Sequence, residues 1–241
     1  MNSAPSFETL AEGLPFRDAI EYFRRKLNLP TLTWTDVWQE MNARSFVVAG
    51  TMQAELIQGF REAVEKGIAD GTTLAEFRKD FDRIVQKHGW AYKGGRAWRT
   101  SVIFNTNLRV AYQAGHYRQM MDPDVLAARP YWRYSAVMDG RTRPMHAAWN
   151  NLVLPYDDPW WKSHYPPNGW GCRCTVVNHS GREVDRLRDR GVKLVEEAPE
   201  IRMIDHQVRQ SDGTIKTVSV PEGIDPGWAY NVGEFAWAEG L

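Results

Sequence analysis

The sequence predicts an α+β fold, in which an N-terminal helical region is followed by a small, loop-rich α+β domain with short strands. In the first half, apolar residues recur three or four positions apart, the spacing of an amphipathic helix. In the second half, short aromatic and β-branched runs alternate with turns rich in Gly and Pro. We place the boundary near the Asp122-Pro123-Asp124 turn, which gives residues 1–125 as the helical region and residues 126–241 as the α+β domain.

Five helices account for the first half. The expected segments are residues 15–27, a short helix capped by Thr33 or Thr35, residues 45–71, residues 74–88 and residues 97–121. The third carries an apolar stripe that runs from Val48 to Ile68 at near-helical spacing, and Gly71 follows it where a helix often ends. Thr73 and Glu76 form a capping box for the fourth helix.

Short strands account for most of the second half. The expected strands are residues 131–137, 151–155, 172–177, 192–195 and 215–220, the last following a turn at residues 210–214. Ser180 and Glu183 form a second capping box, which predicts a short helix that ends at Gly191.

The composition narrows the class of protein. Thirty basic and thirty acidic residues give zero net charge, which removes the simplest argument for a general nucleic-acid binder. No apolar run is long enough to span a bilayer, and the first residues lack the pattern of a signal peptide. We therefore expect synthesis in a reducing cytosol, where stable disulfides are rare. Eleven tryptophans are typical of a protein that uses aromatic rings in interfaces as well as in its core.

One stretch is basic although the chain is neutral. From Arg83 to Met121 there is no acidic residue, and the basic residues are Arg83, Lys87, Lys93, Arg96, Arg99, Arg109 and Arg118. They can form a solvated face that pairs with acids elsewhere, or a contact surface for DNA or an acidic partner. We expect an exposed contact surface.

Both cysteines of the chain lie in the segment YPPNGWGCRC, residues 165–174. Alternate residues of an extended strand point to one face, so Cys172 and Cys174 can both face His146. With a fourth ligand, Asp139 or His164, they would form a structural zinc site. The alternatives are a strained disulfide, a Cys–His nucleophile, and a metal-free knot of buried thiols packed under tryptophans.

The polar residues around the cysteines favour a structural network over catalysis. The Asp139 carboxylate can accept bonds from turn amides. Arg141 and Arg173 can bridge loops through bidentate bonds to Asp157 or Asp158. We therefore assign no catalytic residue and expect a structural clasp, made of Asp139, Arg141, Thr142, His146, Asp158, Cys172, Arg173 and Cys174.

The segment from "DGRTRPMH" to "YPPNGWGCRC" resembles the signature of the phage Mu F-like minor head protein family, also called the phage head morphogenesis family. The segments "GLPFRDAIEYFRRKLNLPT" and "GIDPGWAYNVG" are similar to Mu F-like proteins as well. The resemblance implies a minor virion protein of a tailed phage or prophage. Such proteins associate with the portal inside the capsid and act in head assembly and in DNA packaging or delivery.

The sequence therefore predicts a head morphogenesis protein without enzymatic activity. The expected partners are the portal protein and other head proteins, with packaged DNA as a further candidate and no membrane. The expected location is the capsid interior near the portal, after assembly in the host cytoplasm. Zinc is the one candidate cofactor. The alternatives are a toxin-type enzyme, a nuclease or transferase built on Asp139, Arg141 and His146, and a zinc-stabilised nucleic-acid-binding module. A His146 ring exposed in a cleft would favour the enzyme, whereas a buried ring would favour the clasp.

Overall fold

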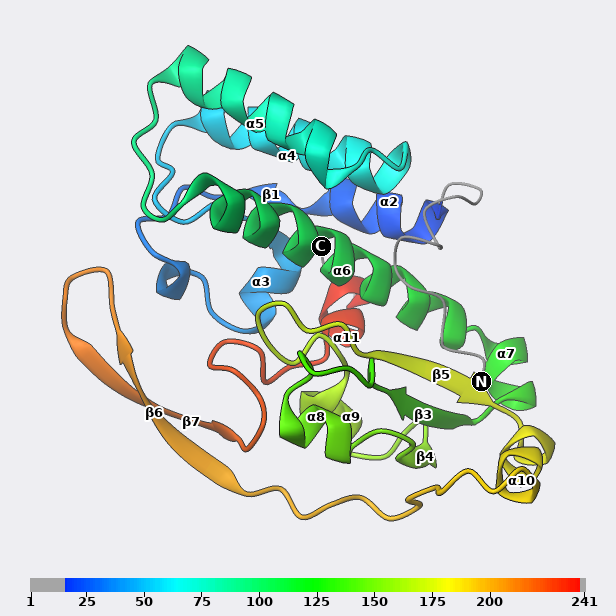
Figure 1. Cartoon of the computed structure of the whole chain (residues 1–241). Coiled ribbons are helices and arrows are strands. Elements are labelled where there is room, and N and C mark those ends of the chain that lie inside the picture. Colours follow the sequence, from blue (N-terminus) through cyan, green and yellow to red (C-terminus); the bar gives the residue numbers. More distant parts are fainter. Residues whose placement is uncertain (1–15, 239–241) are drawn as a thin grey trace.

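A computed structural model describes residues 16–238, and it confirms the α+β fold class (Figure 1). The helices are α2 (Arg17–Arg25), α3 (Glu40–Arg44), α4 (Ala54–Ala69), α5 (Leu74–His88), α6 (Arg96–Met120), α7 (Pro123–Ala128), α8 (Pro144–Ala148), α9 (Trp161–His164), α10 (Gly181–Asp189) and α11 (Val232–Trp237), with a 3-10 turn, η1, at Trp34–Asp36. The strands are β1 (Leu27–Asn28), β2 (Ser45–Phe46), β3 (Tyr131–Ser135), β4 (Val153–Pro155), β5 (Thr175–His179), β6 (Met203–Arg209) and β7 (Ile215–Pro221). The expected start of the first helix near Pro15 lies outside the described residues.

The long helix α6 is the centre of the helical region, and α2, α4 and α5 all pack against it (Figure 1). The expected capping box is present at α5, where the Thr73 side chain accepts from the backbone N–H of Glu76. Gly89 ends this helix in the left-handed conformation. Phenylalanine rings fill the interface: Phe60 lies 5.3 Å from Phe81, and Phe77 lies 5.0 Å from Phe104, measured between ring centroids. These buried rings hold α4, α5 and α6 together.

The expected helix over residues 45–71 is wrong in its first third, because α4 begins only at Ala54. Ser45 and Phe46 instead form β2, which pairs in parallel with β1. Gly50 follows with a φ of 83°, and Thr51 bridges to Thr31. A left-handed glycine and a backbone bridge both interrupt a helix, although the apolar spacing continues through them.

The expected turn at residues 122–124 is the start of a short helix, α7. The Asp122 carboxylate accepts hydrogen bonds from the backbone N–H groups of Asp124 and Val125, and Pro123 occupies the first turn. Aspartate followed by proline is a common helix start, so the turn residues here act as a cap.

The α+β region contains a three-stranded antiparallel sheet in the order β4-β3-β5. Four expected strands are shorter than the sequence indicated: β3 ends at Ser135, β4 begins at Val153, residues 172–174 precede β5, and residues 192–195 contribute only a bridge between Leu152 and Val195. β6 and β7 pair in a separate antiparallel ribbon, which extends away from the sheet (Figure 1).

The two regions share one hydrophobic core. The last helix, α11, returns from the α+β region to pack against α6 and α3. There the Trp237 indole N–H donates to the backbone oxygen of Ala114 at 2.7 Å. Buried residues of both regions belong to one cluster. The division of the chain into a helical region at residues 1–125 and an α+β domain at residues 126–241 stays a prediction. Within residues 16–238, no helix has the length and apolar character needed to cross a membrane.

Lys26, at the end of α2, is buried without a carboxylate partner in the part of the chain that the structure describes. Its Nζ donates to the backbone oxygen of Asn42 at 2.6 Å and to the Tyr22 hydroxyl at 3.2 Å. Only 5% of the residue is exposed. Burial, with a smaller contribution from the charge of Arg61, lowers the pKa of Lys26 from 10.5 to about 7.

We expect Lys26→Met to change how stability depends on pH. Between pH 7 and 10.5 the unfolded chain binds a proton at Lys26 that the folded chain lacks, so the wild-type unfolding free energy rises with pH in this window. The stability of K26M relative to wild type should therefore fall by a few kcal/mol from pH 7 to pH 10, at about 1.4 kcal/mol per pKa unit. Urea denaturation at several pH values measures this, with the exposed Lys87→Met as control. Parallel pH profiles for K26M and wild type would contradict the prediction.

Candidate functional site

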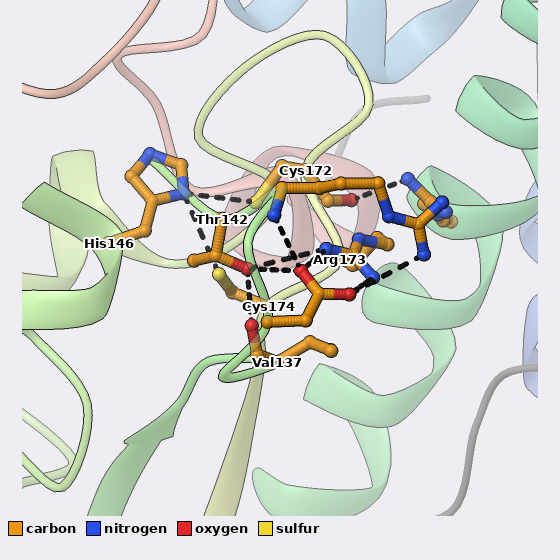
Figure 2. A network of polar contacts seen from close by, with 9 residues as sticks. Val137, Thr142, His146, Cys172, Arg173 and Cys174 are labelled. Carbon is orange, nitrogen blue, oxygen red and sulfur yellow. Dashed lines mark hydrogen bonds and ion pairs between the residues drawn. The ribbon is translucent and has the colours of Figure 1, made fainter. Parts of the chain in front are cut away.

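The expected clasp centres on His146 in α8 and on the loop that precedes β5 (Figure 2). Pro144 occupies the first turn of α8, where its fixed φ suits the helix. The His146 ring is 1% exposed and stacks on Trp149, with ring centroids 5.2 Å apart. His146 Nε2 lies 2.9 Å from the backbone oxygen of Gly223. A carbonyl oxygen only accepts, so this contact requires a proton on Nε2 and leaves Nδ1 facing away from Gly223.

The turn that supplies this carbonyl packs tightly on the clasp. Gly223 has a φ of 89°, and a Cβ atom there would lie 2.7 Å from the Cβ of Met145, so only glycine fits. Two residues on, the Asp225 carboxylate accepts from the backbone N–H of Trp170 at 2.9 Å and from the Arg143 guanidinium at 2.7 Å. The turn therefore fixes both His146 and the loop that carries the cysteines.

Cys172 and Cys174 lie on one side of that loop and face His146 (Figure 2). Each Sγ is 3.6 Å from His146 Nδ1, and the three atoms lie within 4.8 Å of one another. The cysteines are 4% and 5% exposed, and both are free thiols. Gly171, with a φ of 70°, makes the turn that leads into them.

The two thiols influence each other's ionisation. A hydrogen bond with Cys174 lowers the pKa of Cys172, and His146 adds to that effect. The same hydrogen bond, together with burial, raises the pKa of Cys174.

The opposite side of the loop is fixed by three polar side chains of α6, which we call the α6 stripe: Arg109, Gln113 and His116. Arg109 donates to the backbone oxygen of Cys172 at 3.0 Å, and Gln113 donates to that of Cys174 at 3.1 Å. His116 Nε2 lies 2.9 Å from the backbone oxygen of Val176. Burial lowers the pKa of His116, so a neutral ring donates through this nitrogen.

The spacing of the α6 stripe matches that of the loop. Steps of four and three residues along an α-helix rise about 6 Å and 4.5 Å, which is close to the roughly 6.6 Å that two residues of extended chain rise. Side chains at positions 109, 113 and 116 lie along one face of a helix. They therefore reach alternate carbonyls at 172, 174 and 176, and this leaves the cysteine side chains directed toward His146.

Arg173, between the cysteines, holds the loop from outside. Its guanidinium donates to both carboxylate oxygens of Asp139, with Nη1 to Oδ2 at 2.7 Å, and to the Thr142 hydroxyl at 3.3 Å (Figure 2). The Thr142 hydroxyl in turn donates to the backbone oxygen of Val137. Arg173, followed by the backbone N–H of Arg141, holds the pKa of Asp139 well below its usual range. The turn at residues 139–142 is thereby tied to the cysteine loop.

Two expected clasp contacts are wrong. Asp158 does not pair with Arg173: its carboxylate accepts from the backbone N–H of Trp160 at 2.8 Å, while Arg173 pairs with Asp139. Arg141 does not bridge to Asp157 or Asp158. Its side chain is 81% exposed and lies 3.4 Å from Asp139 within the same turn.

Neither expected fourth ligand joins the cysteines. Asp139 is engaged by Arg173. The His164 ring stacks on Trp160, with centroids 4.1 Å apart, and burial lowers its pKa to about 4. Among residues 16–238, the group of possible metal ligands consists of His146, Cys172 and Cys174.

Several of the seven basic residues are engaged within the chain, and a contact surface made of all seven stays a prediction. Arg83 pairs with Asp80, Arg96 pairs with Asp82 at 2.6 Å, and Arg118 pairs with Glu21 at 2.7 Å. Arg99 donates to the backbone oxygen of Lys93 at 2.9 Å, and Lys87 and Lys93 are exposed. Arg109 is turned inward as part of the α6 stripe. Acids from α2 and α5 therefore neutralise much of a stretch that has no acid in its own sequence.

Sequence reasoning missed the roles of Gln113, His116 and Gly223. The sequence does contain a pattern that indicates the roles of Gln113 and His116, because polar residues at 109, 113 and 116 recur at helical spacing among apolar residues. Gly223 lies 77 residues from His146, and no local pattern links the two.

Residues 58–177 match the model of the family described as Phage Mu protein F like protein. This range runs from α4 to β5 and includes α6, α8 and the cysteine loop. The chain belongs to this family, which confirms the resemblance seen in the sequence.

Two curated relatives extend the match over most of the chain. The putative capsid assembly protein F of Escherichia phage Mu is 37% identical in an alignment 251 positions long, which covers 94% of this chain and 56% of that protein. The Mu-like prophage FluMu F protein of Haemophilus influenzae is 35% identical over 227 residues, which cover 86% of this chain and 54% of that protein. The chain thus spans about half the length of the curated relatives it matches. No solved structure matches.

We expect Gln113→Met to destabilise the protein. Gln113 is 4% exposed, and its loss leaves the buried oxygen of Cys174 without this donor. The unfolding free energy should fall by about 1–3 kcal/mol. The matched control is Gln119→Met, since Gln119 is exposed on the same helix, and it should change stability by less than about 0.5 kcal/mol. Equal effects of the two variants in urea denaturation would show that the contact to the loop contributes nothing.

Proposed function

We propose that the chain is a head morphogenesis protein of a Mu-like phage or prophage, and that it acts as a structural component of the head. The observation that carries this proposal is the match over 94% of the chain to the putative capsid assembly protein F of phage Mu. The finer parts of the proposal are association with the portal, a place inside the capsid, and a role in DNA packaging or delivery after assembly in the host cytoplasm.

The buried state of His146 supports an assembly role over the toxin-type enzyme. An enzyme built on Asp139, Arg141 and His146 needs these groups to converge where a substrate can reach them. The His146 ring is instead 1% exposed, and its two nitrogens face Gly223 and the cysteines. The Asp139 carboxylate is bonded to Arg173. These contacts suit a fold-stabilising network.

The surface supports protein partners. Several large apolar side chains are exposed along the segment that leads into the β6–β7 ribbon and in the ribbon itself: Val195, Ile201, Met203, Ile204 and Ile215. Exposed apolar groups that recur on one part of a surface are typical of protein contact sites. The arginines at the start of α6 are engaged within the chain. This pattern favours a head protein, such as the portal, as the first partner, with DNA as a later one.

The test is performed in the phage or prophage that encodes the chain. Deletion of its gene should reduce the number of infectious particles. A functional tagged copy of the gene should restore that number. The tagged chain should be found in purified heads and should cross-link to the portal protein. Absence of the chain from purified heads would overturn the assembly role, and presence without portal cross-links would overturn only the portal association.

We expect Met203→Ser to reduce incorporation into heads several-fold without loss of stability. Met203 is 53% exposed near the start of β6, so its replacement removes apolar contact surface and little of the core. The matched control is Met52→Ser, because Met52 is 57% exposed on the helical region. Quantitative mass spectrometry of purified heads measures both variants, with thermal unfolding as the check on folding. Equal incorporation of the two variants would show that this surface makes no contact in the head.

A further inference from the structure

We propose that His146, Cys172 and Cys174 bind one zinc ion, with His146 Nδ1 and the two sulfur atoms as protein ligands. The site is structural and joins α8 to the loop before β5. The proposal is independent of the role in head assembly, and it rests on the positions and chemistry of the three donor atoms.

The distances between the donor atoms fit tetrahedral zinc. Zinc binds cysteine sulfur at about 2.3 Å and histidine nitrogen at about 2.0–2.1 Å. At a tetrahedral angle these bond lengths place nitrogen and sulfur about 3.6 Å apart. Each cysteine Sγ lies 3.6 Å from His146 Nδ1, and all three atoms lie within 4.8 Å of one another. An ion can therefore be bound with little movement of the backbone.

The contact between His146 and Gly223 prepares the imidazole for a metal. In the neutral ring, the proton that Nε2 donates to the Gly223 oxygen leaves the lone pair on Nδ1, and Nδ1 lies beside the two sulfurs. A histidine ligand in a metal site commonly donates its other N–H to a backbone carbonyl in this way, which fixes the tautomer and the ring orientation. The turn that carries this carbonyl lies close to Met145 at Gly223, and its Asp225 carboxylate ties it to Arg143 and to the backbone of Trp170.

The charge of the site also suits a divalent ion. Two thiolates buried side by side are costly without a counter-charge, whereas two thiolates, a neutral imidazole and Zn²⁺ sum to zero. Soft sulfur ligands with one imidazole favour zinc over magnesium or calcium, which prefer oxygen. Three protein ligands leave the fourth position for water or another small ligand, because the described part of the chain offers no further His, Cys, Asp or Glu to the group.

The loop is held in place independently of any ion. The α6 stripe bonds the carbonyls of Cys172 and Cys174, and Arg173 pairs with Asp139 on the outside. The ligands are thus held by contacts on two sides, which lowers the entropy cost of binding. Zinc would then add to the stability of a loop that already has a defined shape.

The test begins with the wild-type chain, purified with a reducing agent and zinc and then dialysed. Elemental analysis should find about one zinc per chain. Cobalt substitution should give thiolate-to-cobalt charge transfer and the visible bands of tetrahedral Co²⁺. A strong chelator should remove the ion and lower the melting temperature, because binding to the native state stabilises it. A wild-type chain that retains no zinc and gives no cobalt spectrum overturns the proposal, and so does recovery of a Cys172–Cys174 disulfide in place of two thiols.

Variants assign the ligands. Cys172→Ser, Cys174→Ser and His146→Gln should each lose most of the bound zinc, while His88→Gln, at the end of α5, should keep it. Near-ultraviolet circular dichroism separates loss of metal from loss of fold. If a ligand variant fails to fold, chemical blocking of the thiols in the wild-type chain tests the cysteine ligands instead. Modification of both cysteines should release one equivalent of zinc. Folded ligand variants that keep a full equivalent, or modification of both thiols without release, would exclude these residues as ligands.

Discussion

The arrangement of the α+β region depends on the bonds between the α6 stripe and the carbonyls of residues 172, 174 and 176. A loop that is rich in glycine and proline has no hydrogen-bonded ladder of its own, and its buried carbonyls need donors. The stripe supplies them at matching spacing from a helix that also carries the helical region. The strand β5, the cysteines and the sheet are positioned by this one helix.

Successive side chains of the loop point to opposite sides, and this explains why chemically different residues can be neighbours in it. With alternate carbonyls directed to α6, the side chains of Cys172 and Cys174 face the interior, and Arg173 faces the 139–142 turn. One short segment thereby joins three partners: α6, α8 and the turn at Asp139. On the inner side Trp149 stacks on His146, and the two thiols beside this ring are buried.

A structural protein of the head fits this design. The polar side chains that first suggest a catalytic site, such as Asp139 and Arg173, are bonded to one another. By contrast, several apolar side chains along residues 195–215 are exposed on the surface. The family match covers α6, α8 and the cysteine loop but ends before the ribbon. The residues of α6, α8 and the cysteine loop thus lie within the matched range, whereas Gly223 and the ribbon lie outside it.

The sequence by itself determined what depends on local order: the α+β class, the helices α5 and α6, the capping boxes at Thr73 and Ser180, and the nearness of His146 to the cysteines. These follow from periodicity, from caps, and from the alternation of an extended chain. Tertiary structure alone decided that Arg173 pairs with Asp139, that Arg109 turns inward, and that Gly223 orients His146. Several acids and carbonyls are equally suitable partners in the sequence, and only the folded backbone brings one of them within bonding distance.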